Sequence, residues 1–181
     1  MYNFHYNVMK KKYIENIKLL FTDTDSLCYQ IKTDDLYQDM KDMTEHFDFS
    51  EYPENHICYD KTNKKVIGKF KCETNGIPMK EFVGVKSKMY RFTCDDGKQK
   101  GTAKGIKKHI NKKMDIDIYR DCIYNETSTK VQFNQIKSEG HVLKSIMINK
   151  TGITSYDDKR YYLDAINSLP YGHFRILNNS I

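Results

Sequence analysis

The sequence has no long apolar run, no Cys-x-x-Cys pair, and no repeat or low-complexity tract. A membrane-spanning helix needs about 20 consecutive apolar residues, so none is expected. The N-terminus also lacks the basic-then-apolar order of a secretory signal peptide. The five cysteines are scattered and odd in number, which argues against a disulfide framework or a zinc ribbon and favours an intracellular location, nuclear or cytoplasmic.

The composition is that of a folded chain rather than a disordered one. The 181 residues are 39% hydrophobic and 13% aromatic, with 14 tyrosines and no tryptophan. This length suits one domain with a sizeable core, or two small lobes. The formal net charge of +6 is compatible with a polyanionic partner, and equally with a basic surface that has no such role.

Short segments of helical and strand character alternate along the chain, which predicts a mixed α+β fold. We expect a short helix over residues 3–13 and a helix over 34–47 that begins at two acidic residues. A third helix is expected over 116–124, with an apolar side formed by Ile116, Tyr119, Cys122 and Ile123. The pattern further predicts a loop at 50–65 and strands over 17–21, 27–32, 66–73, 81–93, 128–138 and 141–149.

Two acidic residues interrupt an apolar stretch at residues 18–30, KLLFTDTDSLCYQ. Because alternate residues of a strand project to the same side, Asp23 and Asp25 are expected to point together from a hairpin tip. Two neighbouring carboxylates repel each other, and a bound cation relieves that cost. Hard cations such as Mg²⁺ take carboxylate and phosphate oxygens as ligands, which suits two-metal phosphoryl transfer. A solvated turn is the alternative, since Asp and Thr are ordinary turn residues.

The stretch FTDTDSLCYQI (21–31) resembles the D-T-D-S motif of family B DNA polymerases, the palm hairpin that carries a catalytic carboxylate. Further along, VIGKFKCETNG (66–76) is similar to the palm strand segment that follows. VKSKMYRF (85–92) contains Lys88-Met89-Tyr90, which is similar to the K-x-Y motif of protein-primed members. The order of these segments makes the resemblance more specific than D-T-D-S alone.

Two later segments extend the resemblance over nearly the whole chain. AKGIKKHI (103–110) resembles the lysine-glycine segment at the palm-to-thumb transition. YDDKRYYLDAINSLPYGH (156–173) resembles the C-terminal segment of the protein-primed polymerases of Maverick/Polinton-type transposons and related viruses. The resemblance implies an antiparallel palm-type sheet with packed helices over residues 1–95, followed by a small thumb-like region over 96–181.

The resemblance also implies DNA-directed DNA synthesis from dNTPs on a primer–template, with a terminal priming protein as a further partner. Asp25 matches the family's metal-binding aspartate, and Asp23 is its companion in a catalytic site for two Mg²⁺ ions. The family's other metal-binding aspartate lies in an upstream D-x-x-S-L-Y-P motif, which does not occur in this sequence. The chain is therefore expected to correspond to the C-terminal part of a polymerase and to incorporate no nucleotide alone.

DNA contacts are expected from two further places. On a strand, Lys88 and Tyr90 face one way, and an ammonium with a phenol hydroxyl can hold the phosphate or sugar of a primer end. The basic segment 95–113 is expected to follow the duplex, and its candidate contacts are Lys104, Lys107 and Lys108. A solvated helix face is the alternative for this segment.

Two other functions compete with the polymerase. A glycosyltransferase can use D-x-D to hold Mn²⁺ and a sugar nucleotide, but that site normally follows a nucleotide-binding α/β half, and Asp23 is too near the start of the chain. A non-catalytic DNA-binding remnant of a mobile element fits the same residues.

Asp157 and Asp158 are expected to mark a helix start rather than a second metal site.

Overall fold

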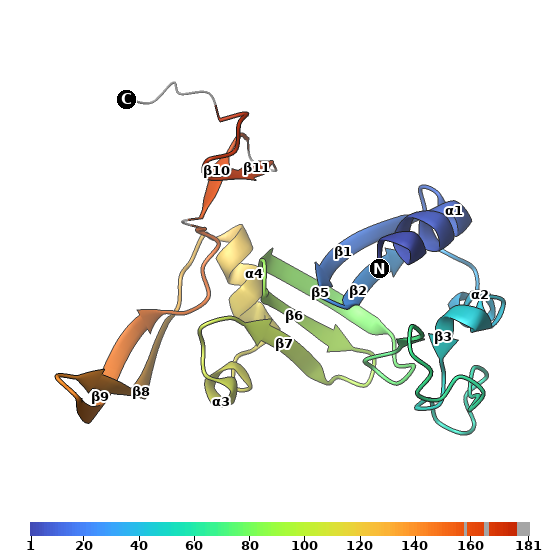
Figure 1. Ribbon diagram of the computed structural model, residues 1–181, viewed down its shortest axis with the longest axis horizontal. Helices are drawn as coiled ribbons and strands as arrows, with labels where there is room; N and C mark the ends of the chain where they lie inside the picture. Colours follow the sequence, from blue (N-terminus) through green and yellow to red (C-terminus); the bar gives the residue numbers. More distant parts are fainter. Residues whose placement is uncertain (158, 165–166, 177–181) are drawn as a thin grey trace.

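The computed structural model describes residues 1–157, 159–164 and 167–176. They form an elongated body of helices and mainly antiparallel strands, so the predicted α+β class is confirmed (Figure 1). The strands pair as β1–β2, β3–β4, β5–β6–β7, β8–β9 and β10–β11, and the β3–β4 pair is parallel. No helix in the described ranges has the length and apolarity needed to cross a membrane.

The chain begins with a continuous helical segment packed on a hairpin (Figure 1). The segment comprises a π-helix, η1 (Phe4–Met9), and one α-helical turn, α1 (Lys10–Tyr13), as predicted for residues 3–13. The hairpin strands are β1 (Ile17–Asp23) and β2 (Ser26–Ile31). Apolar side chains of both strands pack against the buried helix residues Phe4, Met9 and Tyr13. This packing fixes the hairpin, whose tip carries the acidic pair.

The helix predicted over residues 34–47 is interrupted. Asp35 caps α2 (Leu36–Lys41) by accepting hydrogen bonds from the N–H groups of Tyr37 and Gln38. The short 3₁₀ helix η2 (Thr44–His46) then leads into a long irregular region, as predicted for the loop at 50–65.

The strand predicted over residues 66–73 is much shorter than expected. Only β4 (Phe70–Lys71) is extended, and it pairs with the equally short β3 (Phe47–Asp48). Lys65 and Gly68 take left-handed φ angles of 61° and 87°, which a strand does not accommodate.

The central sheet contains β5 (Met79–Lys86), β6 (Met89–Cys94) and β7 (Gln99–Ala103). The prediction of a single strand over residues 81–93 was wrong, because the chain reverses at Ser87 and Lys88. The expected division between residues 95 and 96 lies in the turn between β6 and β7, which are hydrogen-bonded neighbours in this sheet.

The main core lies between this sheet and α4 (Ile116–Tyr124), which coincides with the helix predicted over 116–124. Its buried side is the predicted one except at Ile123, which is exposed. Tyr119 is fully buried and its hydroxyl donates to Asn111 Oδ1 at 2.9 Å, at the end of the short helix α3 (Lys108–Asn111). The helices and the sheet therefore form one packed unit.

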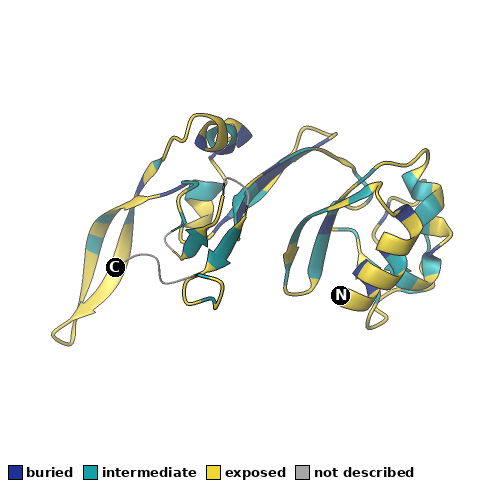
Figure 2. Ribbon diagram, turned by 90° about the horizontal axis from the view of Figure 1, so that it is seen from above, coloured by how far each residue is buried: buried dark blue, intermediate teal, exposed yellow. Residues whose placement is uncertain are grey.

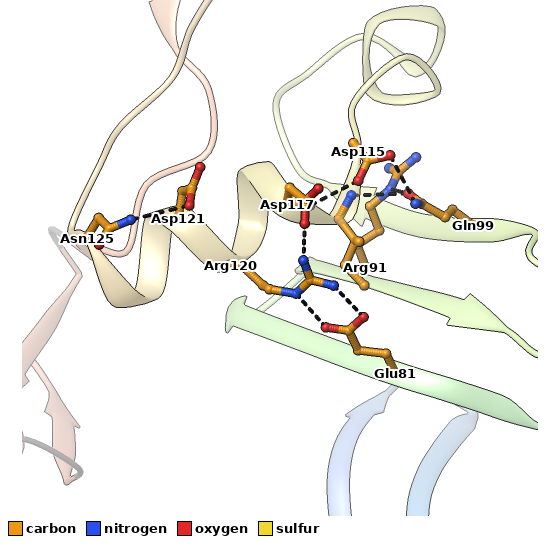
Figure 3. A network of polar contacts seen from close by, with 9 residues as sticks. Glu81, Arg91, Gln99, Asp115, Asp117, Arg120, Asp121 and Asn125 are labelled. Carbon is orange, nitrogen blue, oxygen red and sulfur yellow. Dashed lines mark hydrogen bonds and ion pairs between the residues drawn. The ribbon is translucent and has the colours of Figure 1, made fainter.

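A polar network ties α4 to all three strands of the sheet (Figure 3). Arg120 of α4 makes two 2.7 Å hydrogen bonds to Glu81 of β5. The buried Arg91 of β6 donates to Gln99 Oε1 on β7 at 2.9 Å, and Gln99 Nε2 donates to Asp115, the N-cap of α4. Such paired, satisfied charges hold the sheet in one position relative to the helix.

The strands β8 (Lys130–Glu139) and β9 (Val142–Thr151) form a long ribbon, as predicted, with its turn at Gly140 and His141, one residue later than expected. The ribbon projects from the end of the molecule opposite the N-terminal helix, and most of it is exposed (Figure 1 and Figure 2). Val131 and Phe133 anchor its base in the main core.

The segment after Asp157 forms a small hairpin of β10 (Arg160–Tyr162) and β11 (Ser168–Pro170). The predicted helix start at this place is therefore wrong, although Asp158 itself lies outside the described residues. Aromatic residues such as Tyr161 favour a strand, and the Asn167 carbonyl accepts from the N–H of Leu163 at 2.9 Å to close the turn.

Candidate functional site

The tip of the β1–β2 hairpin is a two-residue turn. Asp23 is the last residue of β1 and pairs with Ser26, the first of β2. Thr24 has a left-handed φ of 54°, and Asp25 completes the turn. Ser26 Oγ donates to the Asp23 carbonyl at 3.0 Å. The expected alternation along one strand was wrong for this pair, because Asp25 lies in the turn and only Asp23 lies on a strand.

Lys88 lies against this tip. Its ammonium donates to Asp23 Oδ1 at 2.6 Å, and the Lys88 side chain is about half exposed. Lys88 is the second turn residue between β5 and β6 and has a left-handed φ of 56°. The expectation that Lys88 and Tyr90 share one strand face was therefore wrong, because only Tyr90 belongs to β6.

Tyr90 lies beneath the tip in a stack of three aromatic rings. Its ring is 4.3 Å from the ring of Phe21 on β1 and 5.8 Å from that of Phe82 on β5, measured between centroids. Phe21 and Phe82 also stack on each other at 5.7 Å. Because β1 and β5 share no backbone ladder, these rings join the hairpin to the central sheet.

The turn formed by Lys104 and Gly105 contacts Lys88. The Lys104 N–H donates to the Lys88 carbonyl at 2.9 Å. Gly105 has a φ of 90°, and a Cβ at that position would lie 2.7 Å from Lys150 Nζ on β9. The structure therefore brings together four residues predicted from three separate motifs: Asp23, Lys88, Tyr90 and Lys104.

The charges of these residues act on one another. The hydrogen bond from Lys88 lowers the pKa of Asp23, and the positive charge of Lys104 lowers it further, against an opposing effect of burial. Burial raises the pKa of Tyr90, and the negative charge of Asp23 adds to the rise. At neutral pH the site thus contains an ionised carboxylate beside an uncharged phenol.

The acidic residues suit a metal only if other ligands join them. In the described residues, no group of three or more His, Cys, Asp or Glu side chains is placed to hold a metal ion. Asp25 is exposed, and its carboxylate makes no hydrogen bond or ion pair within the described part of the chain. Mg²⁺ binds through one or two carboxylates and takes its remaining ligands from waters and phosphates. Asp25 presents an exposed carboxylate of that kind, whereas Asp23 Oδ1 is bonded to Lys88.

The other two predicted DNA contacts lie beside the ribbon. The Lys107 ammonium donates to the carbonyl of Asn134 on β8 and lies 5.3 Å from the centre of the Phe133 ring. Lys108 is exposed on α3. A shallow depression of about 450 Å³ is lined by Lys107, Lys108, His109 and Lys112.

Sequence reasoning missed the lysines of the ribbon. Lys137 lies directly opposite Lys144, and Lys150 directly opposite Val131. By strand alternation, these three lysines share the ribbon face that packs on the core through Val131. The side chains of residues 128–151 alternate between the two faces of the ribbon. Fixing the pairing of the strands about Gly140 would therefore have placed these three lysines on one face.

Comparison with known proteins identified no relative: no family model, curated protein or solved structure matches the chain. The functional interpretation therefore depends on the residues themselves and on the positions that the fold gives them.

Proposed function

We propose that this chain is the palm and thumb portion of a family B DNA-directed DNA polymerase of the protein-primed type. The observation that carries the proposal is the 2.6 Å contact between the Lys88 ammonium and Asp23. It joins the D-T-D-S tip to the K-x-Y turn across 65 residues of sequence. A primer end held beside a metal site needs these two segments at one place.

Each residue of the tip has a distinct role in this proposal. Asp25 offers its carboxylate to a metal, because it is exposed and unpaired within the described residues. Lys88 pairs with the ionised Asp23 and lowers its pKa further, and the remaining N–H groups of Lys88 can donate to a primer phosphate. When bound, Mg²⁺ would neutralise phosphate charge during nucleotidyl transfer. Tyr90 fixes the distance between the hairpin and the sheet through its ring contacts.

The duplex would lie along the basic surface that continues from this tip. It would begin at Lys104, pass Lys107 and Lys108 at the start of α3, and continue along the ribbon lysines. Ammonium groups contact phosphates without reading sequence, which suits an enzyme that copies any template. A priming protein remains a further partner of the proposed enzyme.

Manganese titration followed by NMR tests the metal site. Mn²⁺ is expected to broaden the amide signals of Thr24 to Ser26 first, and those of Lys88 next. Asp25→Asn is expected to abolish this selective broadening. Asp34→Asn is the matched control, because Asp34 is an exposed aspartate on a bend away from the tip. Equal broadening in the wild type and Asp25→Asn would contradict the proposed site.

A second function is favoured by one observation, the lack of a third acidic ligand among the described residues. A DNA-binding remnant of a mobile element would keep the basic surface without the chemistry. For such a remnant, neither Mn²⁺ nor Asp25→Asn should change the affinity for duplex DNA. The polymerase proposal predicts instead that Mn²⁺ strengthens primer–template binding and that this effect requires Asp25.

A further inference from the structure

The N-terminal helical segment, in which Tyr2 and Asn3 are also helical, exposes two tyrosines on one face. Tyr2 and Tyr6 are four residues apart, and their side chains are 81% and 55% exposed. Their rings are nearly parallel, with an angle of 12° between the planes and 6.5 Å between the centroids. Exposed, parallel rings of this kind leave flat apolar faces in water, and they are not needed for the core beneath them.

The Tyr6 ring contacts the buried His5 ring, which in turn packs on the half-buried Tyr29. The His5 ring meets it edge-on at 4.6 Å and stacks on Tyr29 at 5.7 Å, with 8° between those planes. His5 Nδ1 is also 2.9 Å from the Tyr29 hydroxyl. The ring of Tyr6 is therefore supported by His5, which is itself fixed to the hairpin, so ordering Tyr6 on a ligand costs little conformational entropy.

The backbone at this place is a π-helix, in which the Lys10 N–H donates to the His5 carbonyl. Such segments are rare and occur frequently at functional sites. Lys10 and Lys11 follow Tyr6 by four and five residues, which is the one-turn spacing of α- and π-helices. Both lysines are exposed, and neither makes an ion pair within the described residues.

We propose that this surface binds single-stranded DNA. The aromatic-lysine face consists of Tyr2, Tyr6, Lys10 and Lys11, with the rings stacking on unpaired bases and the ammonium groups holding the adjoining phosphates. Single-stranded nucleic acid is commonly bound by this combination of aromatic platform and positive charge.

The chemistry of the face selects this ligand over others. A duplex keeps its base faces inside the stack, so it could use the lysines but not the rings. An apolar protein segment would gain from the rings, but it would bury two unpaired ammonium groups at a large cost. The choice of DNA over RNA rests on the proposed polymerase function, whereas the aromatic-lysine face itself uses no residue of the hairpin tip.

Fluorescence anisotropy with labelled dT₁₂ and the full chain tests the inference. The double variant Tyr2→Ala/Tyr6→Ala is expected to lose about 10-fold or more in affinity, given the usual contribution of base stacking. The conservative double variant Tyr2→Phe/Tyr6→Phe is expected to bind normally, because it keeps both rings. The matched control changes Tyr124 and Tyr156 to Ala, since these residues are also highly exposed but lie at the end of α4 and in the segment after β9.

Duplex DNA and salt provide the second readout. Tyr2→Ala/Tyr6→Ala is expected to leave duplex binding unchanged, and Lys10→Gln/Lys11→Gln to reduce the salt slope for dT₁₂ by about 1.4, or about 0.7 for each phosphate that is no longer neutralised. Circular dichroism would verify that each variant is folded. The inference is overturned if the wild type does not bind dT₁₂, or if the alanine and control variants lose affinity equally. Parallel losses for single strand and duplex, or weaker binding by the phenylalanine variant, would also overturn it.

Discussion

The Lys88 ammonium lies 2.6 Å from Asp23 Oδ1, although 65 residues separate the two in the chain. Asp23 lies at the turn of the β1–β2 hairpin, and Lys88 lies in the turn between β5 and β6 of the central sheet. The aromatic contacts of Tyr90 hold the hairpin and the sheet together. The contact places a lysine against an acidic tip whose second carboxylate, Asp25, remains exposed to solvent. The proposed function follows from this arrangement.

Replacing Lys88 by Met is expected to raise the pKa of Asp23 toward the usual value of about 4, because the hydrogen bond from Lys88 is the largest cause of its depression. The pair stabilises the fold above the unfolded-state pKa, and that stabilisation disappears as pH falls through the lower folded-state pKa. Carboxylate NMR titration measures the shift, with Lys18→Met as the control. Equal Asp23 midpoints in the wild type and Lys88→Met would refute the assigned cause.

Gly105→Ala and Gly97→Ala are expected to lower the stability of the protein equally, but only Gly105→Ala is expected to weaken duplex binding. A left-handed alanine costs about 1–2 kcal/mol, and Gly97→Ala should cost the same, because Gly97 also has a positive φ. At Gly105 the added Cβ meets Lys150 Nζ, which can move away, whereas at Gly97 it meets nothing. Urea denaturation should therefore give similar losses of stability, while a filter-binding assay should show weaker duplex binding for Gly105→Ala alone. Equal binding by the two variants would argue against a role for the Lys104 turn.

Lys137→Gln is expected to stabilise the free protein and to weaken DNA binding. Like charges directly opposite each other on a ribbon are unfavourable, so removing the Lys137–Lys144 repulsion should raise stability by about 0.2–1 kcal/mol. The slope of log K against log salt should fall by about 0.9 if Lys137 neutralises one phosphate of a duplex. Lys64→Gln, in the irregular region at the other end of the molecule, should leave the slope unchanged (Figure 1). An unchanged slope in Lys137→Gln would remove the ribbon from the DNA surface.

Ile153→Ala is expected to destabilise the protein by about 2–5 kcal/mol, because Ile153 is fully buried where the ribbon joins the main core. Ile67→Ala is the matched control, since Ile67 is 99% exposed and should change stability by less than about 0.5 kcal/mol. Thermal or urea unfolding measures both. Similar values for the two variants would show that the ribbon base is not part of the cooperative core.

Elements with a clear periodic pattern could be predicted from the sequence. The helix over 116–124 occurs where expected, because its apolar residues are strongly periodic. The two hairpin strands also occur where expected to within two residues at each end, because a glycine marks their turn. The turn at Lys88 could not be predicted, since Ser87 and Lys88 form no recognisable turn signal and the left-handed φ of Lys88 accompanies a distant ion pair.

The sequence motifs named the candidate residues, but they did not predict how those residues lie relative to one another. The motifs indicate Asp23, Asp25, Lys88 and Tyr90, but alternation along one strand does not explain how either pair lies. In the structure Asp25 and Lys88 lie in turns, and ring packing between separate β-units brings the two motifs together. Contacts of this kind depend on side chains far apart in sequence, which no local pattern encodes.

Photocross-linking of a primer–template tests the central claim most directly. The primer would carry a 3′-terminal 4-thiothymidine and be irradiated with the full chain in Mg²⁺, and the attached residues would be mapped by mass spectrometry. The account predicts cross-links to the Lys88–Tyr90 segment or to the neighbouring 23–26 turn, reduced by Lys88→Met. Cross-links confined to other surfaces, or unchanged by that substitution, would contradict it.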